Sequence, residues 1–448
     1  MNLTDNFKKL FIFTIQKFFG ESFFAEIQRG LRKYFTNTTW GFVGRFFSLG
    51  VAFFVSVYVV RYLGPHQYGL LSYSVSFVGL FGFMANLGLD TILCRDLVKY
   101  PEKRDELLGT AFFLKFSGSL AAVFLILLTS WLIGNDLYST FLITIIALSV
   151  FFRSPIDVIN IYFQAKVSAK FPVMLSILIN AFLSFLKVVL VLLGASLTYF
   201  ALVFLVESII TFTGLIYIYT INKLRIWNWR INLRLAKELL INSWPLVFAG
   251  VFILIYSRID QVIIKYFLDE SAVGIYDVGA RLSEIWYFIP SMIAGSLFPA
   301  IVNAKKVDER LYQVRMAKLY SLLIYLSLVI VVPIFFLADK IVILLYKEAF
   351  IEAANVIRIY AWTLIATAIG TVVNNYLINE NYTKLSLFFN FTGMLINVLL
   401  NIVLIPIYGI TGAALATLIS YFFIPVSVLF FKKTRDHGLL ILRAFMFK

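Results

Sequence analysis

Charged residues lie inside apolar stretches of this sequence, where a charge is costly unless it has a function or a partner. Arg258 and Asp260 fall within one such stretch, and Arg281 and Glu284 fall within the next, over residues 243–301. A guanidinium group binds phosphate oxygens through paired hydrogen bonds, and a carboxylate at such a depth can couple to protons. We therefore expect these residues to face a wet cavity or a partner.

Other charged residues also lie inside long apolar stretches. The basic ones are Arg45, Lys115, Arg153, Lys187 and Arg358, and the acidic ones are Asp157, Glu207 and Asp277. Two pairs have the i,i+4 spacing of neighbours on one helix, so that ion pairs are the alternative to a functional role: Arg153 with Asp157, and Asp277 with Arg281. Arg258 has no such partner, because Asp260 is only two residues away and points to a different face. Arg258 is therefore the strongest candidate for a functional role.

The composition indicates that membrane-spanning helices must hold these residues. The chain has 448 residues, of which 61% are hydrophobic and 14% are charged, and its mean hydropathy is +0.90. These values are typical of an all-α polytopic membrane protein. The net charge of +15 does not indicate nucleic-acid binding, because the cytoplasmic loops of membrane proteins are rich in Lys and Arg.

The residues needed for several other kinds of site are scarce. One cysteine, Cys94, excludes an intrachain disulfide and a cysteine-based metal site, and the two histidines, His66 and His437, argue against a histidine metal centre. The sequence contains no Walker A pattern and no glycine-rich nucleotide loop. We therefore expect no metal, no cofactor and no ATP hydrolysis, and a function other than that of an enzyme.

Twelve apolar spans are predicted, each with about the 20 residues that a helix needs to cross a bilayer. Their approximate bounds are 39–61, 68–90, 106–133, 138–163, 171–194, 197–221, 244–267, 272–302, 316–346, 352–378, 385–407 and 410–431. With the N-terminus in the cytoplasm, 28 of the 39 Lys and Arg residues fall on the cytoplasmic side, four fall outside and seven lie within spans. This distribution predicts a multi-pass protein of the plasma (inner) membrane with both termini cytoplasmic.

Asparagines give the tenth and eleventh spans a polar side. They are Asn374, Asn375, Asn390, Asn397 and Asn401. Hydrogen bonding between helices is the interpretation that this pattern favours.

The first 36 residues differ from a signal peptide, because they contain no long uninterrupted apolar core followed by a small-residue cleavage pattern. Phe and Leu residues recur there near helical spacing, among six basic residues. Residues 1–36 are therefore interpreted as a basic amphipathic segment on the membrane surface, with a disordered or loosely helical tail as the alternative.

A weak internal repeat divides the chain into two parts. RYLGPHQYGLLSY at 61–73 and KYFLDESAVGIY at 265–276 each consist of a basic residue, a tyrosine, apolar residues, a turn, a glycine and the start of a new helix. Six spans separate the copies, so they have the same orientation, which predicts two parallel six-helix lobes around a central cavity. The expected domains are a first lobe at 37–221, a cytoplasmic connector at 222–242, a second lobe at 243–435 and a short C-terminal tail at 436–448.

Several segments resemble a known family of transporters. They are RYLGPHQYG at 61–69 followed by MANLGLD at 84–90, YFQAKVSAKF at 162–171, the block at 257–301, and LIPIYGITGAALATLISY at 404–421. Their order, with twelve spans over about residues 35–435, is similar to that of the Wzx-type O-antigen and polysaccharide flippases of the multidrug/oligosaccharidyl-lipid/polysaccharide exporter superfamily.

The resemblance implies alternating access by two lobes and a polyprenyl-pyrophosphate-linked oligosaccharide as substrate, for cell-surface polysaccharides such as the O-antigen of lipopolysaccharide. It also implies a cavity lined by basic residues, for which the candidates are Arg45, Arg258, Arg281 and Arg153. The candidates for ion coupling are Asp260, Glu207 and Asp157. The partners implied are the lipid-linked oligosaccharide, membrane lipids and, in the same assembly process, a polysaccharide polymerase and glycosyltransferases.

Three other functions stay open on the sequence. A cation-coupled multidrug antiporter of the same superfamily needs a site dominated by carboxylates, whereas the predicted spans hold seven basic and five acidic residues. A membrane enzyme of polysaccharide assembly, such as a polymerase or ligase, usually needs a large external loop, and the predicted outside loops are short. A non-transporting scaffold of a glycan assembly complex is the third alternative.

Overall fold

Every regular element of the described part of the chain is a helix. The computed structural model describes residues 21–168, 170–305 and 308–445, with side chains at 50–168, 170–244, 247–248, 250–305 and 308–444. The α-helices are α2 (Glu21–Gly79), α3 (Gly82–Asn86), α4 (Leu89–Lys99), α5 (Arg104–Ile133), α6 (Leu137–Ala165), α7 (Lys170–Leu192), α8 (Leu197–Ile221), α9 (Leu233–Phe267), α10 (Glu270–Glu284), α11 (Phe288–Lys305), α12 (Glu309–Tyr346), α13 (Ala353–Tyr360), α14 (Thr363–Asn379), α15 (Thr383–Tyr408), α16 (Ile410–Ser427) and α17 (Arg435–Phe445).

The protein is an all-α polytopic membrane protein, as the composition predicts. Nine helical stretches of the described residues are long and apolar enough to cross a membrane. A bent pair, Gly50–Gly79 with Gly82–Lys99, forms a tenth candidate span. Residues 1–20 of the predicted amphipathic segment 1–36 lie outside the described part, and residues 21–36 belong to α2.

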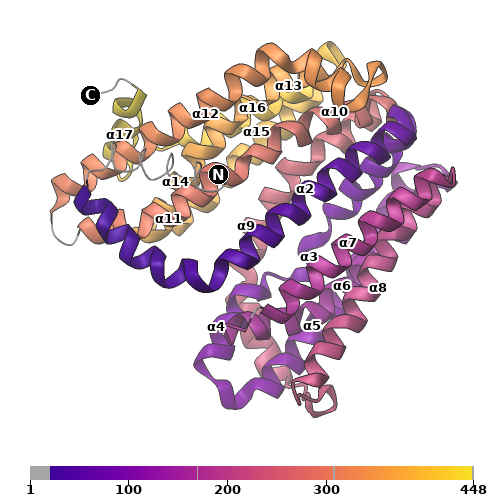
Figure 1. Ribbon diagram of the computed structural model, residues 1–448, viewed down its shortest axis with the longest axis horizontal. Helices are drawn as coiled ribbons and strands as arrows, with labels where there is room; N and C mark the ends of the chain where they lie inside the picture. Colours follow the sequence, from indigo (N-terminus) through magenta and orange to yellow (C-terminus); the bar gives the residue numbers. More distant parts are fainter. Residues whose placement is uncertain (1–20, 169, 306–307, 446–448) are drawn as a thin grey trace, which may run out of the picture.

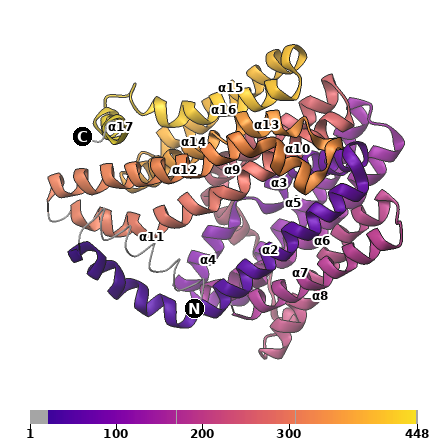
Figure 2. The same ribbon diagram turned by 45° about the horizontal axis from the view of Figure 1, so that its top comes forward.

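The helices form two groups that meet at one end and diverge toward the other (Figure 1, and turned by 45° in Figure 2). In the first group, α6 packs against α5 and α8, and α7 packs against α8 and α2. In the second group, α15 packs against α16 and α9, and α12 packs against α11, α13 and α14. The groups meet where α2 lies along α10. We call them the first half (α2–α8) and the second half (α9–α17).

Helix α2 bends sharply at Gly64, between two of the predicted spans. The backbone of Gly64 has φ 69° and ψ 176°, which glycine adopts far more readily than other residues. Pro65 follows, and proline fits the first turn of a new helical segment because its missing N–H would have no partner there. The bend therefore separates the spans predicted at 39–61 and 68–90, although one continuous element covers parts of both.

The two copies of the sequence repeat lie against each other where the halves meet. A Cβ atom placed on Gly69 would lie 1.7 Å from the carbonyl oxygen of Glu270, and one on Gly274 would lie 2.3 Å from the carbonyl oxygen of Pro65. A side chain cannot fit at such distances, so only glycine allows the two backbones to approach this closely. The glycine that both repeat copies contain thus permits backbone-to-backbone packing of α2 and α10.

Three predicted spans are less continuous than the sequence suggests. The second is interrupted by Leu87 and Gly88, which both have left-handed backbone conformations between α3 and α4. The eighth is divided by a short 3-10 turn, η3 (Ile285–Tyr287), and the tenth is divided between α13 and α14. These breaks lie next to the pocket described below, where η3, α4 and α14 all contribute residues.

The polar segments expected between and after the lobes contain helix. Helix α9 begins at Leu233, inside the predicted connector 222–242, where the Asn232 side chain accepts hydrogen bonds from the amides of Arg234 and Leu235. Such a cap satisfies amides that have no partner within the helix. The tail predicted at 436–448 contains most of α17, which packs against α12.

Helix α17 is attached to the rest of the second half through His437, which is only 4% exposed. Its ring stacks on Tyr376, with the ring centroids 3.6 Å apart and the planes 3° apart. Its Nε2 atom lies 2.7 Å from the Tyr320 hydroxyl. Burial, with a smaller effect of the Lys305 charge, lowers the pKa of His437 from 6.5 to about 3. The neutral imidazole is therefore the form that fits this site.

Acidification is expected to loosen α17 from the second half. A histidine with a lowered pKa binds fewer protons when docked than when detached, so its stabilising effect is complete above pH 6.5 and decreases as the pH falls below that value. The loss between pH 6.5 and pH 5 is about 2 kcal/mol. The protection of residues 435–445 against hydrogen exchange, corrected for the slower chemical exchange at lower pH, should decrease over this range, and His437→Phe should remove this pH dependence of the protection. A variant with the same pH dependence would contradict the role of His437.

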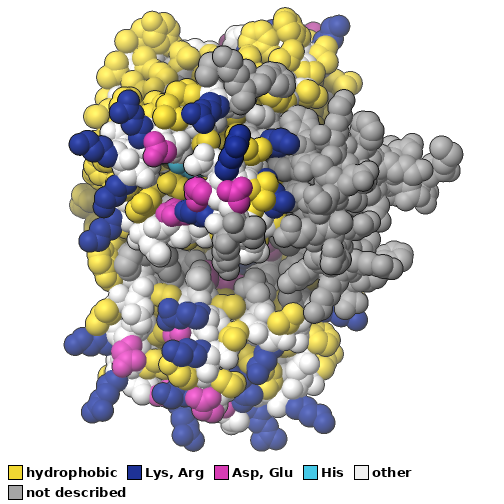
Figure 3. All heavy atoms as spheres, turned by 90° about the vertical axis from the view of Figure 1, so that its left-hand side faces the viewer, with side chains coloured by type: hydrophobic (Ala, Val, Ile, Leu, Met, Phe, Trp, Pro, Cys, Tyr) yellow, Lys and Arg dark blue, Asp and Glu magenta, His cyan; other side chains and the backbone are white. Residues whose placement is uncertain are grey.

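Basic side chains gather on the side of the molecule toward which the halves diverge. Figure 3 views this side and shows Lys and Arg side chains over both halves, with acidic side chains among them. Exposed basic residues of the turns and helix ends include Lys99, Lys103, Lys166, Arg225, Arg230, Arg310, Lys384, Lys432 and Lys433. The predicted orientation requires this distribution, while the orientation itself stays a prediction.

Candidate functional site

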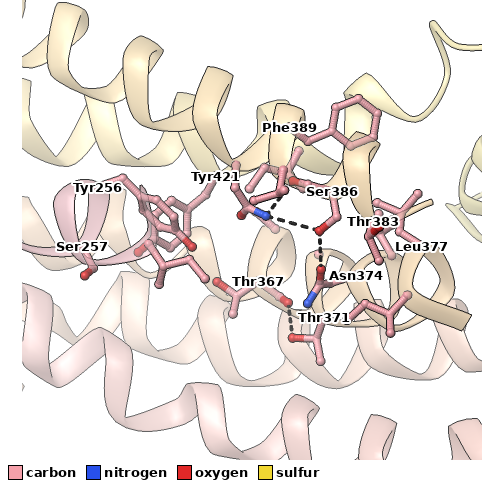
Figure 4. Close-up of a pocket in the computed structure, with 18 of the residues that line it drawn as sticks. Tyr256, Ser257, Thr367, Thr371, Asn374, Leu377, Thr383, Ser386, Phe389 and Tyr421 are labelled. Carbon is pink, nitrogen blue, oxygen red and sulfur yellow. Dashed lines mark hydrogen bonds between the residues drawn. The ribbon is translucent and has the colours of Figure 1, made fainter. Parts of the chain in front are cut away.

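A pocket of about 810 Å³ lies between the second half and helix α4 of the first half. Its wall is formed by α9, α14, α15 and α16, and Figure 4 shows polar side chains that line it, among them Thr371, Asn374 and Ser386. Two residues of its rim, Arg95 and Thr383, are close in sequence to the exposed basic residues Lys99 and Lys384. The pocket therefore has its rim on the basic side of the molecule.

The deeper part of the pocket combines tyrosines with one acid. Tyr256, Tyr287 and Tyr421 line it together with Glu284. The rings of Tyr256 and Tyr421 are perpendicular, with centroids 5.3 Å apart. Glu284 Oε1 accepts a hydrogen bond of 2.9 Å from the hydroxyl of the buried Tyr360. Glu284, one of the charged residues within the span that follows Arg258, thus lies on the wall of the pocket.

Arg258, the main anion-binding candidate, lies beside this deeper part of the pocket. It is half-buried on α9 and follows the lining residue Ser257. Among the basic residues, it has the largest electrostatic effect on the Glu284 carboxylate. Within the described residues, its guanidinium group forms no hydrogen bond and no ion pair within 4.0 Å. Its five N–H donors are therefore available to a ligand.

Arg281 forms the i,i+4 ion pair with Asp277 that the sequence predicts. Its Nε atom lies 2.6 Å from Asp277 Oδ2. The Asp277 side chain is 1% exposed, whereas the Arg281 side chain is 47% exposed. Glu284 interacts with Arg281 only through charge, because its hydrogen bond comes from Tyr360. Arg281 is thus anchored by a buried carboxylate and still accessible to a ligand.

Asp277 also joins the two halves. It accepts hydrogen bonds from Tyr68 of α2 and from Gln261 of α9, whose Nε2 atom lies 2.6 Å from Oδ1. Gln261 in turn accepts hydrogen bonds from Ser76 and from Ser72, the latter over 3.0 Å. All five residues are buried. Because a charged acceptor strengthens hydrogen bonds in a low-dielectric interior, this network holds α2 firmly against α9 and α10.

Lys265 provides a second connection between the halves, one turn along α9. Its Nζ atom donates a hydrogen bond of 3.0 Å to Ser139 of α6 and lies 4.0 Å from Asp136. It also lies 4.1 Å from the centroid of the Tyr73 ring, a cation–π distance. Within the second half it is 3.4 Å from Glu270. Both repeat copies therefore take part in the contact that closes this end of the molecule.

Lys187 is a cation of the site that sequence reasoning did not single out. It is half-buried on α7, and the charges that act on it are Glu207 of α8 and Arg281 of the second half. Within the described residues, its ammonium group forms no ion pair within 4.0 Å. Lys187 therefore brings a positive charge of the first half near Arg281. The sequence signal is the depth of Lys187 within the span predicted at 171–194. Lys115, within the span predicted at 106–133, gives the same kind of signal.

The expected pair of Arg153 with Asp157 is not formed. Arg153 Nη1 instead lies 2.7 Å from Glu207 Oε1, because α6 packs against α8 and brings that carboxylate opposite the guanidinium. Asp157 accepts a hydrogen bond of 3.2 Å from Asn160 on its own helix. The pairing gives Arg153 and Glu207 a structural role, so their assignments to pyrophosphate binding and to ion coupling have less support than those of the second half.

Asp260 does not line the pocket and is buried among oxygen-bearing side chains. Its carboxylate is 3% exposed and accepts hydrogen bonds from Tyr276 at 2.6 Å, Asn401 at 2.6 Å and Thr417 at 2.7 Å. Asn397 lies beside Asn401, 3.2 Å from its amide nitrogen. Within the described part, no Lys or Arg pairs with Asp260, and the buried Oδ1 atom of Asn401 has no hydrogen-bond partner. A buried carboxylate without a counter-charge requires a proton or a cation.

The other charges within spans are structural or not described. Lys115, 1% exposed, pairs with Asp90 at 2.6 Å and so joins α5 to α4. Arg358 pairs with Asp339 of α12. Arg45 lies on α2, and its side chain is outside the described residues.

The fold is that of a known class of membrane transporters. The lipid II flippase MurJ, in an inward closed conformation, matches with a TM-score of 0.71 over 91% of this chain and 91% of that chain, at 18% sequence identity. The inward-facing conformation of a multidrug resistance transporter of the MATE family, in the MOP superfamily, gives a TM-score of 0.68 over 88% of this chain and 95% of that chain, at 13% identity. At these identities the likeness establishes the fold.

The chain belongs to the family described as "Polysaccharide biosynthesis protein", whose model matches residues 35–305. A second family model, MatE, matches residues 245–403. A Haloferax volcanii protein named "Probable low-salt glycan biosynthesis flippase Agl15" is 29% identical over 170 residues, which are 37% of this chain and 35% of that protein. The chain spans between 35% and 43% of the length of the first curated relatives that it matches. The resemblance found in the sequence is therefore confirmed at the level of the family.

Proposed function

We propose that this protein is a flippase that moves a polyprenyl-pyrophosphate-linked oligosaccharide from the cytoplasmic to the outer leaflet of the plasma (inner) membrane, for cell-surface polysaccharide biosynthesis. The observation that carries the proposal is a set of cations from both halves: Arg258 and Arg281 act on Glu284, which lines the polar pocket, and Lys187 of the first half is within electrostatic reach of Arg281. Pyrophosphate is multiply anionic, and guanidinium groups bind its oxygens bidentately. The name of the Haloferax volcanii relative, a probable flippase of glycan biosynthesis, supports a flippase function in glycan biosynthesis.

In this proposal the protein replaces the water that the head group leaves. A sugar cannot cross hydrocarbon unaided, because its hydroxyl groups would lose their hydrogen bonds. The polar wall of the pocket supplies donors and acceptors to the sugars, the cations neutralise the pyrophosphate, and the polyprenyl tail stays in the bilayer. The halves then rock about this site and expose it to the opposite side.

The proposed topology has twelve spans. Nine of them are the apolar stretches of the described part. The other three are helix α9 and the two parts of α2, one on each side of Gly64. Residues 37–221 and 243–435 form the two lobes, and the connector 222–242 and both termini lie in the cytoplasm. The basic side is then cytoplasmic, and the contact of α2 with α10 lies at the outer side. In this proposed orientation, the halves are in contact at the outer side and diverge toward the cytoplasm, as alternating access requires of one of its states.

A reconstituted transport assay tests this function. The purified protein in liposomes is given a fluorescent polyprenyl pyrophosphate that carries a short oligosaccharide, and the lipid that reaches the opposite leaflet is measured. We expect flipping of this lipid and no transport of a cationic dye. The MatE match over residues 245–403 is the observation that favours the multidrug antiporter, and dye transport without lipid flipping would support that alternative. Elongation or ligation of the oligosaccharide would indicate an enzyme instead. Contacts with a polymerase or glycosyltransferases are a separate proposal, which crosslinking in cells tests.

We infer that Asp260 couples flipping to an ion gradient. Its surroundings offer carboxylate, hydroxyl and amide oxygens, which suit a proton or a small hard cation. The next residue in the sequence, Gln261, belongs to the hydrogen-bond network that joins the halves. In Asp260→Asn, an imposed proton or sodium gradient should no longer change the flipping rate, whereas it should accelerate the wild type. Asp436→Asn, at an exposed carboxylate of α17, is the control. A gradient response retained by Asp260→Asn would rule this coupling site out.

A further inference from the structure

The wall of the 810 Å³ pocket is almost free of charge. Among the described residues that line it, the charged ones are Arg95 at the rim and Glu284 at the deep end. Between them the lining consists of apolar, aromatic, hydroxyl and amide side chains. Such a surface can hydrogen-bond a neutral ligand but cannot compensate the desolvation of a charged one.

Two helices of the wall share a network of neutral polar groups that is only partly satisfied. Ser386 Oγ donates a hydrogen bond of 2.9 Å to Asn374 Oδ1, and Asn390 Nδ2 donates one of 2.8 Å to the carbonyl oxygen of Ser386. Figure 4 shows this network on the pocket wall. Within the described residues, Asn374 Nδ2 and Asn390 Oδ1 take part in no hydrogen bond. The wall therefore offers a fixed donor and a fixed acceptor to a ligand.

The deeper part of the pocket is aromatic. Tyr256 and Tyr421 stand in perpendicular contact, and Ser257 lies next to Tyr256 on the same helix. An aromatic face packs on the apolar C–H surface of a sugar ring, while amides and hydroxyls bind its hydroxyl groups. The deep end of the pocket adjoins Glu284 and, through it, Arg258. A glycan in the pocket would thus extend away from a pyrophosphate held by the cations.

We propose that this pocket is a binding site for the uncharged sugars nearest the lipid, and that it selects against sugars that carry a carboxylate or a sulfate. This proposal rests on the proposed flippase function. An acidic sugar would meet the Glu284 carboxylate, whose neighbour Arg258 is engaged by the pyrophosphate, and a wall whose one cation among the described lining residues is Arg95 at the rim. The Asn374–Ser386–Asn390 network is the part of the pocket that recognises neutral hydroxyl and acetamido groups.

Binding of three lipid probes to the full chain in nanodiscs tests the proposal. The probes are polyprenyl pyrophosphate without sugar, the same lipid with an N-acetylglucosamine disaccharide, and the same lipid with a disaccharide that contains glucuronic acid. The neutral glycolipid should bind about 10-fold more tightly than the sugar-free lipid, because its sugars form hydrogen bonds with the pocket. The acidic glycolipid should bind about 10-fold more weakly than the neutral one, because its carboxylate is desolvated without a counter-charge. A 10-fold change in affinity corresponds to about 1.4 kcal/mol. Equal binding of the neutral and acidic glycolipids would overturn the proposal.

Variants of the network separate sugar recognition from anion binding. Asn374→Ala/Asn390→Ala should bind the neutral glycolipid about as weakly as the sugar-free lipid and should bind the sugar-free lipid like the wild type, which also shows that the variant is folded. Asn375→Ala is the matched control, because Asn375 is adjacent to Asn374 in α14 and does not line the pocket. If the double variant binds the neutral glycolipid with wild-type affinity, the sugar site is disproved, while the proposed flippase function is not. Failure of every probe to bind would disprove the proposed function, and the sugar site with it.

Discussion

Replacing Arg258 by alanine should lower the rate of glycolipid flipping by about 10- to 100-fold, the effect of losing hydrogen bonds to a charged ligand. Arg258 is half-buried beside Glu284 and has donors that no described residue uses. Its loss also leaves the Glu284 carboxylate without its main counter-charge, next to the place of the pyrophosphate. The measurement is the flipping assay in liposomes, with protein amounts matched.

Two further substitutions make this result specific. Arg258→Lys should retain part of the activity, because lysine keeps the charge but cannot bind phosphate bidentately. Lys340→Ala removes an exposed cation of α12 and should leave flipping unchanged. Near-normal transport by Arg258→Ala would refute the role of this residue in pyrophosphate binding.

The second large effect is expected at the contact between the repeat copies. Gly274→Val should reduce flipping to the background of empty liposomes, because a side chain there would meet the carbonyl oxygen of Pro65 and the backbone nitrogen of Gly69. Both obstacles are backbone atoms, which cannot turn aside as a flexible side chain can. The variant would then be unable to bring α2 and α10 together, and the outer side could not close.

Closure can be measured directly, because Cys94 is the one cysteine of the chain. In a Cys94→Ser background, a cysteine in place of the buried Ser72 should be protected from a membrane-impermeant thiol reagent applied outside. Adding Gly274→Val should expose it. Gly295→Ala is the control, because a Cβ atom at Gly295 would meet nothing within 4 Å. Protection of the cysteine in Gly274→Val, together with normal flipping, would show that this contact is dispensable.

The architecture follows from features that a single sequence displays. Apolar length marks the spans, and the excess of Lys and Arg in alternate loops predicts the basic side seen in Figure 3. The i,i+4 spacing of Asp277 and Arg281 predicts their ion pair, because both residues lie on one helix. Arg258 stands out for the complementary reason, since no carboxylate has a helical spacing that would neutralise it.

Contacts between helices are less predictable, because they depend on how the helices rotate and pack. Glu207 takes the place of Asp157 as the partner of Arg153, since it faces that residue from a neighbouring helix. The asparagines also divide in a way that the sequence does not reveal. Asn401 of α15 donates a hydrogen bond to the buried Asp260 of α9, and Asn374 of α14 accepts one from Ser386 of α15, which agrees with interhelical hydrogen bonding. Asn374 and Asn390 also line the pocket.

The double use of the Asp277 carboxylate has a thermodynamic consequence. This one group holds the Arg281 guanidinium and also accepts the hydrogen bonds that fasten α2 to the second half. An anion that draws Arg281 away leaves Asp277 as an uncompensated buried charge, and so changes the free energy with which the halves adhere. Linkage makes the effect mutual: separating the halves must alter the affinity for the anion by the same factor. Anion binding and closure of the halves are therefore coupled through a single carboxylate, Asp277.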